Sequence, residues 1–137
     1  MAFTGNYSCN TLRTGLLDGT INFNSDTFYL ALYTNTATLN ANTTEYTTTG
    51  ESSGGNYVAG GQVVTASIAT EGTTSYVNFS SPSWTGSITA RGALIYKPGA
   101  NGAVCVLDFG SDKTSIVSFN VQMPVNTASS ALIRLVN

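Results

Sequence analysis

The chain of 137 residues contains no histidine and very few charged side chains. Asp, Glu, Lys and Arg make up 9% of the residues, whereas a soluble domain averages about 25%, and serine, threonine and asparagine supply the polarity instead. The lack of histidine excludes the commonest general base, the usual serine-hydrolase triad and most zinc sites. The sequence therefore predicts a protein that is not an enzyme and has no metal site and no cofactor.

The basic residues are also too few and too dispersed to form a phosphate-binding stripe. The five of them are Arg13, Arg91, Lys97, Lys113 and Arg134, so we expect no binding to nucleic acid. No apolar run reaches the roughly 18 residues of a transmembrane helix, which predicts no membrane association. The first residues lack the basic start and apolar run of a signal peptide, which favours synthesis in the cytoplasm.

Two cysteines, Cys9 and Cys105, leave a single disulfide as an option. Cys105 lies in the apolar run 103–107 and is typical of a small buried residue. Cytoplasmic synthesis favours free thiols over a bridge.

Seven carboxylates remain as candidates for acid–base chemistry. Asp108 and Asp112 bracket a predicted turn at 109–111. A functional interpretation is that they form a weak calcium-binding loop or a pair of carboxylates for glycoside hydrolysis. Turn capping is the favoured interpretation because the local sequence offers few further oxygen ligands. Glu45 and Glu51 lie in a polar stretch, where solvated loop charge is the simplest interpretation.

The first twenty residues differ from the rest in their apolar spacing. Apolar residues recur every three or four positions, which predicts one short helix over about 7–17. The residues concerned are Cys9, Leu12, Leu16 and Leu17, with Asn6 or Ser8 as the N-cap and Gly19 at the end.

The rest of the sequence predicts strands, from about residue 27 to residue 136. Residues 27–33 are apolar on both faces and predict a central strand. The Pro-Gly and Asn-Gly pairs within 97–102 predict a hairpin between 88–96 and 103–109. Further strands are expected at 62–65, 75–79, 116–123 and 131–136, with Val117, Phe119, Val121 and Met123 on one buried face.

These elements predict a single all-β domain covering residues 1–137. Short strands joined by turns rich in Gly, Pro and Asn indicate a β-sandwich. About eight strands favour a jelly roll, and an immunoglobulin-like topology is the alternative.

The polar stretch 35–55 is longer than a simple turn and is flanked by aromatic residues. Tyr46 and Tyr57 lie in or next to it, and Trp84 falls in the predicted loop 80–86. Exposed tyrosine and tryptophan can anchor a protein interface or stack on a sugar. Trp84, Tyr46 and Tyr57 are thus candidate interface residues, and for Trp84 a place in the core is the competing interpretation.

Several segments resemble small structural proteins of tailed bacteriophages. The resemblance spans most of the chain, and its motifs are structural rather than catalytic. It is carried by the segments 18–23 (Asp-Gly-Thr-Ile-Asn-Phe), 28–40, 57–61, 90–96 and 103–110.

Among such proteins, a capsid decoration or cement protein fits this size best. The resemblance implies a homo-oligomer that binds the major capsid protein on the outer surface of the virion and stabilises contacts between capsid subunits. A head- or tail-fibre component, or a module that binds a glycan or receptor, is the alternative. The low charge predicts a contact held by apolar packing and main-chain hydrogen bonds, including strand addition at a sheet edge.

Overall fold

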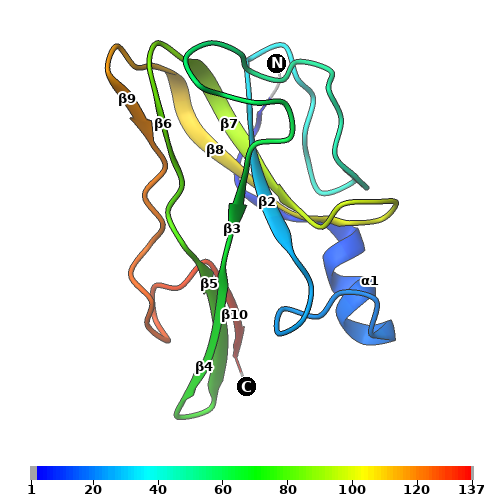
Figure 1. Cartoon of the computed structure of the whole chain (residues 1–137). Helices are drawn as coiled ribbons and strands as arrows, with labels where there is room; N and C mark the ends of the chain where they lie inside the picture. Colours follow the sequence, from blue (N-terminus) through cyan, green and yellow to red (C-terminus); the bar gives the residue numbers. More distant parts are fainter. Residues whose placement is uncertain (1–2, 137) are drawn as a thin grey trace.

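The computed structural model describes residues 3–136 as one helix and ten strands in three antiparallel sheets (Figure 1). The all-β fold with one short helix is confirmed. In chain order the elements are β1 (Tyr7–Ser8), α1 (Asn10–Asp18), β2 (Phe28–Tyr33), β3 (Gln62–Val64), β4 (Ala66–Glu71), β5 (Thr74–Phe79), β6 (Ser83–Thr85), β7 (Thr89–Tyr96), β8 (Ala103–Thr114), β9 (Ser118–Asn120) and β10 (Ile133–Val136).

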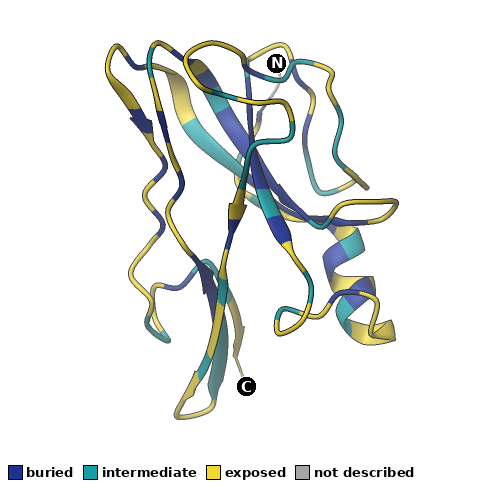
Figure 2. Ribbon diagram, viewed as in Figure 1, coloured by how far each residue is buried: buried dark blue, intermediate teal, exposed yellow. Residues whose placement is uncertain are grey.

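The largest sheet has the strand order β1-β8-β7-β2-β3 and is buried on both faces in its centre (Figure 2). In β2, Phe28, Leu30 and Leu32 pack into one apolar cluster, while Ala31 and Tyr33 pack into a second. Because successive side chains of a strand point to opposite faces, the two clusters lie on the two sides of the sheet. The central strand predicted at 27–33 is confirmed.

The larger apolar cluster joins this sheet to two smaller ones, β10-β5-β4 and β6-β9. Phe79 of β5, Trp84 of β6 and Phe119 of β9 all belong to it. The layer opposite the large sheet is therefore divided into two short sheets. This arrangement differs from the two continuous sheets of a jelly roll. The strand order could not be predicted, because the apolar pattern of each strand does not determine how the strands are connected.

The hairpin of β7 and β8 is the longest pairing in the molecule, and its predicted loop at 97–102 is confirmed. The turn predicted at 109–111 is wrong, because β8 continues to Thr114. The ladder pairs Gly92 with Asp108 and Ala90 with Lys113, so residues 109–112 bulge opposite Arg91 alone. Gly110 supplies a positive φ of 84° within this bulge.

The helix begins three residues later than predicted, at Asn10. Tyr7 and Ser8 pair with Val106 and Cys105 of β8, so the sheet takes up the segment that the apolar spacing assigned to the helix. Cys9 is the N-cap and its side chain makes no capping hydrogen bond.

The predicted caps at the start of the helix are wrong, and the predicted end is confirmed. The Asn6 side chain accepts a hydrogen bond from the backbone N–H of Asp108, and the Ser8 hydroxyl accepts one from Arg13. Gly19 ends the helix with a φ of 80°.

Residues 116–123 form a shorter strand than predicted. Phe119, Val121 and Met123 are buried as expected, but Val117 is 78% exposed. Val117 lies in the connection from β8 to β9, where its carbonyl accepts a hydrogen bond from Gly86. Strand β4 was not predicted, because none of its residues is buried and Ile68 is its only large apolar side chain.

Candidate interaction surfaces

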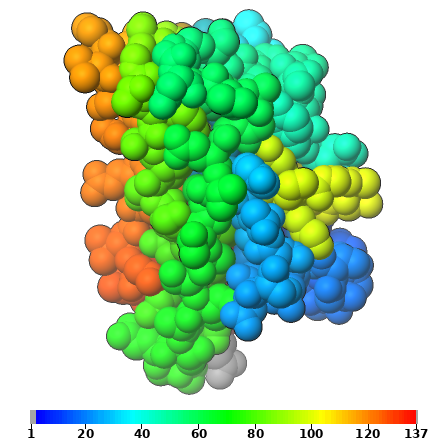
Figure 3. Space-filling view, in the orientation of Figure 1, coloured from blue at the N-terminus to red at the C-terminus, as the bar shows by residue number. Residues whose placement is uncertain are grey.

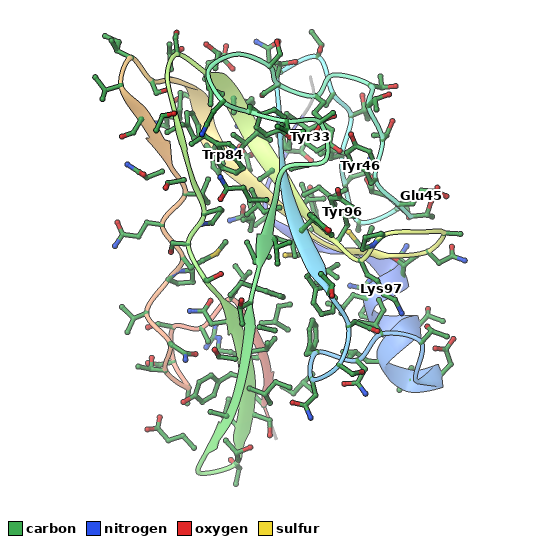
Figure 4. All side chains as sticks on the ribbon, in the orientation of Figure 1. Tyr33, Glu45, Tyr46, Trp84, Tyr96 and Lys97 are labelled. Carbon is green, nitrogen blue, oxygen red and sulfur yellow. The ribbon has the colours of Figure 1, made fainter. Side chains whose placement is uncertain are left out.

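Trp84 lies in the core and is 2% exposed. It is paired across the β6–β9 ladder with Phe119, and its ring is 5.5 Å from that of Tyr57. Figure 4 shows it inside the sandwich, among the other core side chains. Of the two interpretations left open by the sequence, the structure shows the core position, so the indole is not available to a partner.

Tyr46 and Tyr57 are half-buried and both donate hydrogen bonds to Glu51. Tyr46 Oη lies 2.5 Å from Glu51 Oε1, and Tyr57 Oη lies 2.6 Å from Oε2. The backbone N–H of Gly60 donates to the same Oε2 over 2.8 Å. The interpretation of Glu51 as solvated loop charge is wrong, because its carboxylate has three protein donors. Glu45 is exposed, as expected.

Two further tyrosines extend this cluster (Figure 4). Tyr33 donates to the carbonyl of Thr47 over 2.7 Å, and Tyr96 donates to that of Gly60 over 2.6 Å while stacking on Tyr46. Burial, and then the nearby Glu51 carboxylate, raise the pKa of Tyr96 to about 12. The hydroxyls thus stay protonated as donors, and the cluster holds the long segment 34–61 against the large sheet.

Asp108 and Asp112 have different partners. Asp108 forms an ion pair with Arg91, whose guanidinium lies 5.8 Å from the ring centre of Phe3. Asp112 accepts a hydrogen bond of 3.0 Å from the side-chain amide of Asn35. Within residues 3–136, no three His, Cys, Asp or Glu side chains gather as a metal-binding group.

Cys9 and Cys105 are both buried and both free, as predicted. Burial raises the pKa of the Cys9 thiol to about 11, and the nearby Arg13 charge acts in the opposite direction. Burial also raises the pKa of the Cys105 thiol. Both cysteines act as small apolar residues: Cys105, in β8, packs into the larger apolar cluster, and Cys9 packs into the smaller one.

The β10-β5-β4 sheet projects beyond the rest of the sandwich (Figure 1), and one of its faces carries exposed apolar side chains around a buried Val77. Val77 in the centre is flanked by Ile68 and Ile133, and Leu135 follows on the same face. Ile68 is 54% exposed and Leu135 is 63% exposed. Leu16 and Phe23 border a small depression of about 90 Å³ over this face, whose lining is mainly apolar and also includes Ser75.

A larger groove of about 510 Å³ runs between the end of β8 and β9. Phe109 and Phe119 contribute aromatic surface, with ring centres 6.2 Å apart. Lys113 is the only charged side chain in its lining. The remaining lining residues are Thr114, Ser115, Ser118, Asn120, Val121 and Gln122. Figure 3 shows the segment that carries β9, in orange, along one side of the molecule.

A third depression, of about 420 Å³, lies between α1 and the 97–102 loop. Its lining is rich in hydroxyl and amide groups and includes Thr14, Asp18 and Asn101. Lys97 borders it, donating to the carbonyl of Thr20 over 2.7 Å and pairing with Asp26 at 3.1 Å. Hydroxyl and amide groups beside one carboxylate and one ammonium group are suited to hydrogen-bonding a hydroxyl-rich ligand.

No family model, curated protein or solved structure matches this chain. The helix α1, with nine residues, falls well short of a membrane-spanning apolar helix, and no other described helix qualifies.

Proposed function

We propose that the protein is a structural, non-enzymatic component of a phage virion. It binds the major capsid protein on the outer surface of the capsid, as a homo-oligomer, and stabilises the contacts between capsid subunits. Support comes from the resemblance to phage structural proteins and from a surface with few charges to desolvate.

The observation that carries the proposal is the open apolar face of the β10-β5-β4 sheet. The charged residues of this sheet, Glu71 and Arg134, lie on the opposite face, because they alternate with Ile68 and Ile133 along their strands. A partner that covers the open face gains about 25 cal/mol for each Å² of apolar area and leaves no charge unpaired. Repetition of a modest contact over a symmetric shell makes it strong collectively.

Sedimentation with empty capsids tests this proposal, using the neighbouring residues Leu135 and Val136. Leu135→Thr removes an apolar side chain from the open face, while Val136→Thr makes a similar change on the opposite face of the same strand, where Val136 is 67% exposed. Burial of a leucine contributes about 1.5–3 kcal/mol. We expect Leu135→Thr to weaken capsid binding at least about tenfold and Val136→Thr to leave it unchanged.

A wild-type protein that stays in the supernatant with capsids overturns the assignment to the virion surface. If Leu135→Thr and Val136→Thr bind capsids equally well, the capsid contact lies on another face of the protein. Light scattering of the pure protein tests the homo-oligomer, and a monomer at micromolar concentration contradicts that part of the proposal.

The alternative function, binding of a glycan or receptor, is favoured by the polar depression between α1 and the 97–102 loop. Its hydroxyl, amide and carboxylate groups are those that hydrogen-bond sugars, and it replaces Trp84 as the candidate site. A glycan array tests it. Failure to bind any glycan, together with failure of the soluble protein to compete with host adsorption, rules this alternative out.

A further inference from the structure

We propose that the groove between β8 and β9 binds an extended segment of the capsid protein by strand addition. The inference rests on the proposed function and assigns its main-chain contact to a particular groove. The segment has an apolar residue directed at Phe109 and Phe119 and an acidic residue near Lys113. Three features of the groove lead to this occupant.

The first feature is the edge of β9 that pairs with no other strand of the described residues. The carbonyl of Val117 accepts from Gly86, and the N–H of Val121 donates to the carbonyl of Pro82, so residues 117, 119 and 121 face β6. In an antiparallel ladder, alternate residues direct their backbone groups to opposite sides. The N–H and C=O groups of Ser118 and Asn120 consequently point away from β6, and both residues line the groove.

The second feature is the end of β8 on the other side, whose outer edge has no strand partner among residues 3–136. The N–H of Ser115 donates to the carbonyl of Ile88, and Lys113 is paired with Ala90, so these two residues face β7. Thr114, between them, directs its backbone groups away from β7. β1 covers the edge of β8 only at Cys105 and Val106, which leaves the end of the strand open. Unpaired edges of this kind are templates for another strand.

The third feature is the chemistry of the side chains. Phe109 is half-buried and Phe119 is 7% exposed, so the groove reaches the apolar core. Lys113 is exposed and forms no ion pair among residues 3–136. An extended segment that alternates its side chains can direct an apolar residue to the phenylalanines and hold a carboxylate within reach of Lys113.

The principal test compares two substitutions at Asn120 by sedimentation with capsids. Asn120→Pro removes an N–H that points into the groove and makes no bond to β6, and proline is tolerated at such edge positions. Asn120→Ala changes the same side chain and keeps the N–H. We expect Asn120→Pro to lose at least about tenfold in capsid binding, and Asn120→Ala to bind like the wild type. The fluorescence of Trp84, the single tryptophan, verifies that the β6–β9 pair is intact.

Amide hydrogen exchange of the wild-type complex gives a test that needs no variant. Strand addition predicts slower exchange at Ser118, Asn120 or Thr114 in the capsid-bound protein than in the free protein. Lys113→Glu tests the contribution of charge, since it places a second carboxylate next to the acidic residue proposed for the bound segment. We expect it to weaken binding more than Lys113→Gln does.

The outcomes separate the two proposals. If the wild type binds capsids while Asn120→Pro binds equally well and exchange at these amides is unchanged, the groove inference is overturned and the proposed function stands. If the wild type does not bind capsids, both are overturned. Loss of binding by Asn120→Pro, with protection of these amides in the wild type, supports the inference.

Discussion

Glu51 accepts three hydrogen bonds from within the segment 34–61. One of its donors, the Tyr57 hydroxyl, also accepts from the backbone N–H of Leu32 in β2, which ties the cluster to the large sheet. Replacement with Gln removes the negative charge and one of the two acceptor oxygens, so at least one donor from Tyr46, Tyr57 or Gly60 loses its partner. Hydrogen bonds to charged groups contribute about 1.5–3 kcal/mol each. We expect Glu51→Gln to lower the free energy of unfolding by about 2 kcal/mol, measured by urea denaturation.

The matched control for this substitution is Glu45→Gln. Glu45 lies in the same segment and is exposed. An exposed substitution typically changes stability by no more than about 0.5 kcal/mol. If the two variants have the same free energy of unfolding, the hydrogen bonds to Glu51 do not stabilise the packing of segment 34–61.

The same cluster predicts a loss of stability at alkaline pH. The pKa of Tyr96 is raised to about 12 in the folded protein, against roughly 10 in an unfolded chain. The folded state therefore holds the proton more tightly, and this contribution is fully present below pH 10 and lost as pH rises through 12. We expect the urea midpoint to fall between pH 10 and pH 12.

Tyr96→Phe identifies the source of this pH dependence. The variant lacks the hydroxyl that donates to Gly60, so it is less stable by about 1 kcal/mol at pH 8. Its urea midpoint should fall less steeply above pH 10 than that of the wild type. An equally steep fall in both proteins would assign the effect to other groups.

At the scale of elements, the bend before β3 depends on Gly61. It has a φ of 83°, and a Cβ atom there would overlap the carbonyl oxygen of Leu30. Gly72, between β4 and β5, also has a positive φ of 61°, but it has open space around it. Gly72→Ala should cost about 1 kcal/mol from backbone strain alone, while Gly61→Ala should cost about 4 kcal/mol or more.

Thermal or urea unfolding of the two glycine variants measures this difference. The prediction fails if Gly61→Ala is no less stable than Gly72→Ala. Such a result would mean that β2 and β3 separate at little cost, contrary to their pairing through Phe28, Tyr29 and Leu30.

Elements with a strong local signal could be predicted from the sequence. The loop at 97–102 carries turn residues, and β2 is apolar on both faces. Local signals mislead where a distant strand competes for the same residues: Tyr7 and Ser8 have helical neighbours, but the edge of β8 pairs with them. The sequence of the bulge at 109–112 resembles that of a turn, because both structures favour glycine and short polar residues.

The candidate site was less accessible to sequence reasoning than the elements. Aromatic residues in apparent loops looked exposed, yet Trp84 is in the core because the alternation of β6 directs its side chain inward and leaves Ser83 and Thr85 exposed. The short spacing of Tyr46, Glu51 and Tyr57 was a usable signal for a hydrogen-bonded cluster. The groove between β8 and β9 had no signal in the sequence, since it depends on which strand edges remain unpaired.

At the scale of the whole molecule, the charge is low: the chain has five basic and seven acidic side chains, so long-range electrostatic attraction to a partner is weak. Exposed ion pairs contribute at most about 1 kcal/mol each, and salt screens them. We expect the affinity for capsids to change by less than about fivefold between 50 mM and 500 mM NaCl. Sedimentation across this range measures it, and a decline of a hundredfold or more would indicate a contact dominated by charge.

The bulge in β8 has a consequence for how such a protein can diverge. Residues 109–112 lie opposite Arg91 alone, so the chain can gain or lose residues there without shifting the ladder on either side. Phe109 and Lys113 stand at its two ends and both line the groove. Insertions and deletions in this short stretch would reshape one wall of the proposed binding groove while the register of the flanking ladder is kept, so specificity could change there without a change of fold.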